Sequence, residues 1–288
     1  PLMILAGAGT GKTFTLENRI VYLIKEYKVD PKHLLAITYT EKAANELKNR
    51  VIEKVGAKAH SMTVNTFHAF CYKLLKDNDF SSKQLLDESE AVHMFLTRFD
   101  ELKPFESTEF PLDPQRAITE SFMPFFNRMR DELIDPEKVK VSQLKDDDTL
   151  TDETRQQLSD LKRIYPLFQS WKEELNVVDY GDMILSAYQM ISTNKSILKN
   201  IQDNYRHIVI DEFQDNNFAL NEIVNLIAGK RNYVTAVGDD DQVIYSFRGA
   251  NNFNIQAFRE RYGDHEKYQS IALETNYRSN QAILDLAN

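Results

Sequence analysis

Short apolar runs, each followed by an amphipathic run, open the chain. Residues 2–6 are apolar and short enough to be a buried strand, whereas residues 12–27 place apolar side chains at helical spacing. The same order of strand and helix recurs in two further pairs of segments, 34–39 with 41–54 and 62–65 with 67–75. Because strands that alternate with helices build parallel sheets covered on both faces, the pattern predicts an α/β fold.

The character of the chain changes after residue 76. Residues 76–174 contain helical patterns, six prolines and the acidic run 146–148, but no convincing strand. We interpret this stretch as an all-helical subdomain inserted into the α/β unit, and residues 146–152 as a solvated loop or helix start, not a metal site. Apolar strand-like runs return at residues 207–211 and 233–237, where the α/β pattern resumes.

The charge balance gives only weak evidence about partners. Across 288 residues, 35 basic side chains face 44 acidic ones, for a net charge of −9. Residues 1–74 nevertheless carry eleven basic and six acidic side chains, so a local basic surface is compatible with the composition. The net charge of the chain therefore neither establishes nor excludes nucleic acid as a partner.

The remaining composition bears on the compartment. No apolar stretch approaches the length of a membrane span, so no membrane partner is expected. The single cysteine, Cys71, excludes an internal disulfide and fits a reducing, cytoplasmic compartment. The chain begins at Pro1 inside a predicted strand, which suggests a piece of a longer protein.

A glycine-rich segment between the first predicted strand and helix is typical of a phosphate-binding loop. Glycines allow backbone N–H groups to surround phosphate oxygens, and the helix N-terminus adds partial positive charge. Lys12 would reach the β and γ phosphates, and the Thr13 hydroxyl would bind Mg²⁺. The alternative is a simple glycine-rich turn with an exposed lysine. The loop residues expected around the phosphates are Gly7, Ala8, Gly9, Thr10 and Gly11.

Two carboxylates end the apolar run at residues 207–211. Asp211 is placed to bind Mg²⁺, and Glu212 to orient or deprotonate the attacking water. Alone, they would be read as exposed acids at a strand end. Paired with the phosphate loop, they predict hydrolysis of a nucleoside triphosphate.

Residues 237–250 combine an acidic turn, a glutamine, two aromatics and an arginine. The acidic half suits a metal–nucleotide site, and the aromatic and basic half suits stacked bases and a phosphate backbone. Together with further blocks, this segment resembles superfamily 1 helicases of the UvrD, Rep and PcrA type. The other blocks that carry the resemblance are residues 38–47, 66–70, 178–183, 211–215 and 273–279.

The resemblance implies further roles at the nucleotide. Gln242 would sense the γ-phosphate, and Arg278 would act as an arginine finger from the second motor domain. Tyr277 would stack on the adenine of ATP. The family often carries an arginine after the loop threonine, where this chain has Phe14. Phe14 either stacks without the charge or belongs to the core.

The resemblance also implies a nucleic-acid track. Tyr39, Tyr245 and Phe247 take positions at which the family stacks bases, although ordinary packing under loops is the alternative. Three polar residues would contact backbone phosphates or order the loops that do so, and Arg248 would bind nucleic acid or tie its segment to the nucleotide site. The three polar residues are Thr38, Thr66 and His68.

The implied fold is a RecA-like P-loop NTPase sheet with an all-helical insertion. The predicted bounds are 1–75 and 175–268 for the first RecA-like domain, 76–174 for the insertion and 269–288 for the start of a second RecA-like domain. The implied function is an ATP- and Mg²⁺-dependent DNA helicase or translocase that moves 3′ to 5′ on single-stranded or partly duplex DNA, with DNA repair as a context.

Two other functions fit the same motifs. One is the motor of a RecB- or AddA-type helicase-nuclease, and the other is a nucleotide-dependent nucleic-acid-binding module without unwinding. Because ATP would bind between two RecA-like domains, we expect the 288 residues alone to bind nucleotide weakly and not to unwind DNA without the rest of the second domain.

Overall fold

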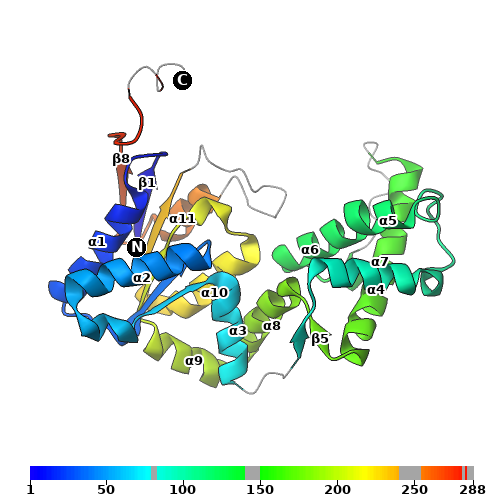
Figure 1. Cartoon of the computed structure of the whole chain (residues 1–288), viewed down its shortest axis with the longest axis horizontal. Coiled ribbons are helices and arrows are strands. Elements are labelled where there is room, and N and C mark those ends of the chain that lie inside the picture. The colour runs from blue at the N-terminus through cyan, green and yellow to red at the C-terminus, as the bar shows by residue number, and fades with distance from the viewer. Residues whose placement is uncertain (79–82, 140–149, 240–253, 281–282, 284–288) are drawn as a thin grey trace. The chain divides into compact units, whose positions relative to one another are not determined.

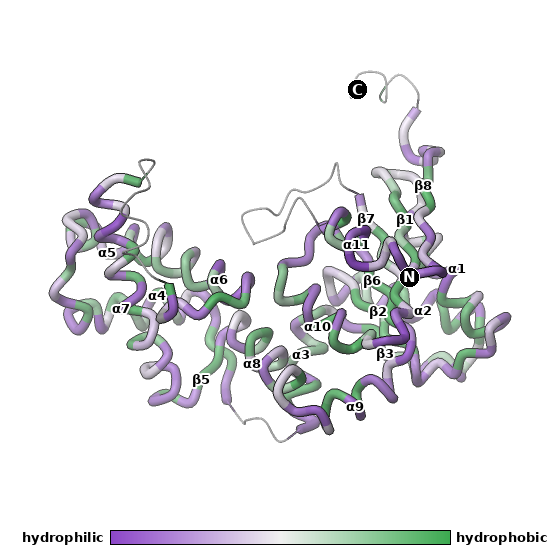
Figure 2. Tube along the Cα trace, turned by 180° about the vertical axis from the view of Figure 1, so that it is seen from behind, coloured by the Kyte–Doolittle hydropathy of each residue, from purple (hydrophilic) through white to green (hydrophobic). Residues whose placement is uncertain are grey.

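The computed structural model describes residues 1–78, 83–139, 150–239, 254–280 and 283. It separates the chain into two compact units (Figures 1 and 2). The first unit comprises Pro1–Lys73 and Ala187–Asn288, and the second comprises Leu74–Ser186. The helical stretch is therefore an insertion in the sequence of the first unit.

The first unit contains a six-stranded parallel sheet, which confirms the predicted α/β class. The strand order is β3-β2-β6-β7-β1-β8. Because all described pairings are parallel, the carboxyl ends of the strands share one edge, where ligands of open α/β sheets bind. The strands are β1 (Leu2–Ala6), β2 (Leu34–Thr38), β3 (Thr63–Thr66), β6 (His207–Ile210), β7 (Val234–Gly238) and β8 (Gln269–Leu273).

Helices cover both faces of this sheet, as the buried patterns of its strands require. All five residues of β2 and all five of β7 are buried, although side chains alternate between the faces of a sheet. On one face, Leu16 of α1 and Leu47 of α2 pack with Val209 of β6 in a single core cluster. The helices that lie wholly in the first unit are α1 (Lys12–Lys25), α2 (Glu41–Val55), α9 (Lys195–Asn204), α10 (Phe218–Ala228) and α11 (Asn254–Tyr262). Helix α3 (Phe67–Asp77) begins in the first unit and ends in the second.

Strand β8 is the main element that the hydrophobic pattern did not predict. It pairs with β1 in parallel, with Met3 opposite Ser270. Four of its five residues are exposed, so it lacks the apolar run that identifies a buried strand. The sheet of the first unit thus extends to Leu273, whereas the predicted domain boundary stood at residue 268. The assignment of 269–288 to a second domain stays a prediction.

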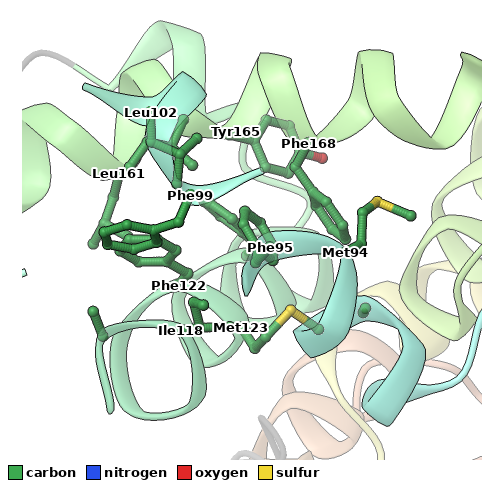
Figure 3. Packing of buried hydrophobic residues seen from close by; sticks show 14 of the residues in the cluster. Met94, Phe95, Phe99, Leu102, Ile118, Phe122, Met123, Leu161, Tyr165 and Phe168 are labelled. Atoms are coloured by element: carbon green, nitrogen blue, oxygen red, sulfur yellow. The ribbon is translucent and has the colours of Figure 1, made fainter. Parts of the chain in front are cut away.

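The second unit is built around an aromatic core. Phe95 stacks on Phe168 with ring centroids 4.6 Å apart (Figure 3). Phe95 also meets Trp171 edge-on at 5.6 Å. A two-residue parallel ladder joins β4 (Gln84–Leu85) to β5 (Val177–Val178), and it is too short to give a strand pattern in the sequence. The helices are α4 (Glu88–Thr97), α5 (Pro114–Arg116), α6 (Met123–Asp131) and α7 (Asp152–Glu174), followed by α8 (Tyr180–Thr193), whose last residues belong to the first unit.

Two smaller expectations concern the acidic run and the membrane. Thr151 caps α7 by accepting a hydrogen bond from the backbone of Thr154, so Asp152 is the first residue of a helix. Residues 146–149 lie outside the described residues. Among the helices that the structure describes, none has the length and apolar character needed to cross a bilayer.

Candidate nucleotide site

The segment between β1 and α1 forms a tight loop at a helix N-terminus. Gly9 (φ 79°) and Gly11 (φ 91°) adopt left-handed conformations, which glycine tolerates without a steric penalty. The Thr10 backbone N–H and hydroxyl both donate to the Gly7 carbonyl, at 3.2 and 2.8 Å. Among the described residues no side chain caps α1, and its first turn holds no acidic residue, so its N–H groups can serve an anion.

The two halves of the predicted hydrolytic site meet beside this loop. Lys12 Nζ lies 3.2 Å from Glu212 Oε2. Asp211 directly follows β6 and continues its pairing, because its N–H donates to the Ile37 carbonyl at 2.9 Å. The Asp211 Oδ1 atom in turn accepts a hydrogen bond from Glu212 N at 3.1 Å. The fold thus joins Lys12, Asp211 and Glu212 across about two hundred residues of sequence.

Negative charge accumulates at this point. Burial, and then the neighbouring Glu212, raise the pKa of Asp211 to about 6. The same two causes raise the pKa of Asp215 to about 6, and in the described part of the chain its buried Oδ1 atom has no hydrogen-bond partner. A cation bound at this site would favour the charged carboxylates and so lower both pKa values.

The donor set fits Mg²⁺ bound mainly through a nucleotide. Within the described ranges, no group of three His, Cys, Asp or Glu side chains is arranged to hold a metal ion. Magnesium commonly takes only one or two carboxylates from a protein, together with substrate phosphates and water. Asp211 and the Thr13 hydroxyl, at the strand end and in the first turn of α1, would supply such a partial set.

Two residues without a predicted role complete the site. Gln214 is 2% exposed, donates from Nε2 to Glu212 Oε2 at 2.9 Å and accepts from the backbone N of Asp239 at 3.0 Å. Asn276 Nδ2 donates to the Ala8 carbonyl of the phosphate loop at 2.7 Å. Both lie inside motif blocks, but the contacts of Gln214 with Asp239 and of Asn276 with Ala8 join distant segments, so no local signal could assign them.

The residues predicted around the base lie close to the loop. The Tyr277 N–H donates to the Gly9 carbonyl at 2.9 Å, and a Cβ built on Gly9 would stand 2.7 Å from Arg278 Cβ. The Tyr277 side chain is 80% exposed. Phe14 is 63% exposed, so it does not belong to the core.

Some of the predicted nucleic-acid residues lie in the described part of the chain, and others lie outside it. Tyr39 follows β2 at the same sheet edge and is 39% exposed, and His68 is also exposed. Thr38 donates its hydroxyl to the Thr40 carbonyl at 3.0 Å, and Thr66 Oγ1 accepts from Ala69 N at 3.2 Å, which favours loop ordering for these two threonines. The remaining predicted residues lie outside the described residues: Gln242, Tyr245, Phe247 and Arg248.

Comparison with known proteins identifies the family. Residues 1–263 match the model of the UvrD/REP helicase N-terminal domain. The chain belongs to the UvrD/Rep helicase family. The resemblance inferred from the motif blocks is confirmed, and the parallel sheet with its helical insertion is the fold expected of a UvrD/Rep N-terminal domain.

Similarity to individual UvrD/Rep relatives extends along the whole chain. DNA helicase II of Haemophilus influenzae is 31% identical over 99% of the chain, and the ATP-dependent DNA helicase PcrA of Staphylococcus epidermidis is 32% identical over 100% of it. The ATP-dependent DNA helicase UvrD1 of Mycobacterium tuberculosis is 33% identical over 100% of the chain. The chain spans 37% of the length of each of these three relatives.

Proposed function

We propose that the chain is the N-terminal motor region of an ATP-dependent DNA helicase or translocase. The observation that carries the proposal is the meeting of Lys12 with Glu212 and Asp211 beside a phosphate loop, at the carboxyl edge of a parallel sheet in a UvrD/Rep chain. A kinase that phosphorylates small molecules would share the loop but would have no need of the aromatic and basic block at residues 237–250.

The proposed reaction is hydrolysis of ATP to ADP and phosphate. Water attacks the γ-phosphorus, Glu212 accepts a proton from that water, and the bond to the ADP oxygen breaks. Lys12 holds the β and γ phosphates, and Arg278 stabilises the charge that develops on the transferred group. Bound Mg²⁺, held by Asp211 and Thr13 with phosphate oxygens, would neutralise phosphate charge.

The proposed coupling to DNA rests on the aromatic track. Tyr39, Tyr245 and Phe247 would stack bases of a single strand that moves 3′ to 5′, and Gln242 would report the γ-phosphate to that track. Thr38 and Thr66 would order the adjacent loops, while His68 and Arg248 would contact the nucleic-acid backbone. Action in the cytoplasm on repair intermediates belongs to the same proposal.

The test is the ATPase rate of the full-length protein with single-stranded DNA, with RNA and with neither. We expect DNA to raise the rate by at least about tenfold and the Lys12→Ala variant to remove the activity. Displacement of streptavidin from one end of a labelled oligonucleotide would report direction, with loss from the 5′ end expected. An ATPase rate that DNA leaves unchanged would contradict the motor assignment.

A further inference from the structure

Gln214 joins the ends of two strands of the sheet through one buried side chain. Its Nε2 donates to Glu212 Oε2 at 2.9 Å, just beyond β6, and its Oε1 accepts from Asp239 N at 3.0 Å, just beyond β7. An amide has a donor end and an acceptor end, so a rotation by half a turn would face like groups at both contacts. The orientation of this side chain is therefore fixed by its two partners.

The neighbouring strand leaves room for this amide. A Cβ built on Gly238 would stand 2.9 Å from Gln214 Oε1 and 3.5 Å from Phe213 Cβ. Gly238 is not among the residues with positive φ, so space rather than backbone conformation explains the glycine. The absence of a side chain at Gly238 therefore provides the space that the Gln214 amide occupies.

The backbone of Gln214 is held as well. Asn254, the first residue of α11 and 3% exposed, donates from Nδ2 to the Gln214 carbonyl at 3.0 Å and to the Asn216 carbonyl at 2.6 Å. The Oδ1 atom of Asn254 accepts from Asn221 Nδ2 of α10 at 2.9 Å. The turn that carries Gln214 is thus anchored to two helices.

Glu212 depends on such support. Its backbone is left-handed, at φ 48° and ψ 48°, a conformation that a residue with a Cβ adopts only when its surroundings impose it. The Lys12 ammonium and the Gln214 amide both contact Oε2 of its carboxylate, and neither of these contacts engages Oε1. A bound phosphate would compete for Lys12, whereas Gln214 stays fixed through Asp239.

We propose that Gln214 is a positioning residue for ATP hydrolysis. Its amide fixes the rotation of the Glu212 carboxylate through Oε2, so that Oε1 accepts the proton of the attacking water. The inference rests on the proposed function, because it requires Glu212 to activate that water. It adds a residue that touches neither the nucleotide nor the metal, and whose effect passes entirely through Glu212.

A double-mutant cycle on the DNA-stimulated ATPase of the full-length protein tests this role. Gln214→Met keeps the length of the side chain but removes both hydrogen bonds. It should lower kcat by about 10- to 100-fold while the KM for ATP changes less than about twofold, because only the alignment of the base is lost. In a Glu212→Gln background, the same substitution should change the residual kcat by less than about twofold, since nothing remains to be aligned.

A second variant and a control complete the experiment. Gly238→Ala should displace the amide and reproduce the loss of kcat, so it decides the matter if Gln214→Met does not fold. Gln202→Met is the matched control, because Gln202 donates from Nε2 to the Leu226 carbonyl at 2.7 Å in the same unit without touching the site. It should leave kcat at the wild-type value.

The outcomes separate the two proposals. A wild-type protein without DNA-stimulated ATPase would overturn the proposed function itself. An active wild type in which a folded Gln214→Met or Gly238→Ala variant keeps its kcat would overturn only the positioning role. The positioning role would also be overturned if Gln214→Met lowered kcat equally with and without the Glu212 carboxylate.

Discussion

Phe14 follows the loop threonine, at the position where the resemblance to UvrD-type helicases implies that an arginine is common. Its ring is 63% exposed, and Lys54 Nζ of α2 lies 5.1 Å from the ring centroid. Lys54 is held by the buried Glu17 carboxylate at 2.6 Å and by Asn18 Oδ1 at 3.0 Å. A positive charge therefore stands against an aromatic face beside the phosphate loop, supplied by a different helix.

This arrangement predicts that Phe14 supports the base of ATP. Phe14→Ala should raise the KM for ATP by about tenfold with little change in kcat, because a base–aromatic stack contributes roughly 1–3 kcal/mol. Steady-state kinetics of the full-length protein would measure it. Tyr27→Ala is the matched control, since Tyr27 is a 65% exposed aromatic just beyond the other end of α1. An unchanged KM in Phe14→Ala would exclude the stack.

At the scale of elements, the sequence predicts what burial and backbone geometry impose locally. Strands β1, β2 and β6 appear as apolar runs because both of their faces are covered, and Gly9 and Gly11 stand where positive φ requires them. The sequence does not predict strand β8, because its residues are largely exposed and its position depends on pairing with β1. The contacts of Gln214 with Asp239 and of Asn276 with Ala8 could not be predicted either, because each joins segments that are distant in sequence.

Three helices of the second unit meet at a buried cluster of charges. Arg130 of α6 and Lys172 of α7, each 2% exposed, contact Asp179, which precedes α8, at 2.7 and 2.8 Å. Asp182 of α8 contacts the same two cations. Gly181 lies so close that a Cβ there would stand 2.7 Å from Arg130 Nε. Burial alone would raise the pKa of Asp179, but the two cations hold that pKa well below its ordinary value.

Removing one charge from this cluster should destabilise the second unit. Asp179→Asn leaves two buried cations with one carboxylate, and breaking a buried pair in this way costs about 3–5 kcal/mol. Because the pKa of Asp179 is depressed, its contribution is complete above about pH 4 and is lost as the pH falls below that value. Urea unfolding at pH 7 should therefore show the full loss. Asp203→Asn, at an exposed pair with Arg231, should change stability by less than about 1 kcal/mol.

At the scale of the whole molecule, the candidate nucleotide site lies in one unit, and the other unit has a separate core of its own. The described residues of the candidate nucleotide site, from Gly7 to Arg278, belong to the first unit, whereas the second has its own aromatic core and its own charge cluster. A ligand that binds only the folded first unit stabilises that unit alone. The two units should consequently respond differently to nucleotide and to substitution.

We therefore expect two separable unfolding transitions in the chain, one for each unit. ATP with Mg²⁺ at a hundred times the dissociation constant should stabilise only the first unit, by about 2.7 kcal/mol, whereas Asp179→Asn should lower only the transition of the second. Differential scanning calorimetry would resolve the heat absorbed in each step, and hydrogen exchange would assign each step to its residues. A single transition that shifts as one under both changes would show that the two units unfold together, and that the division in the structure is not a division in stability.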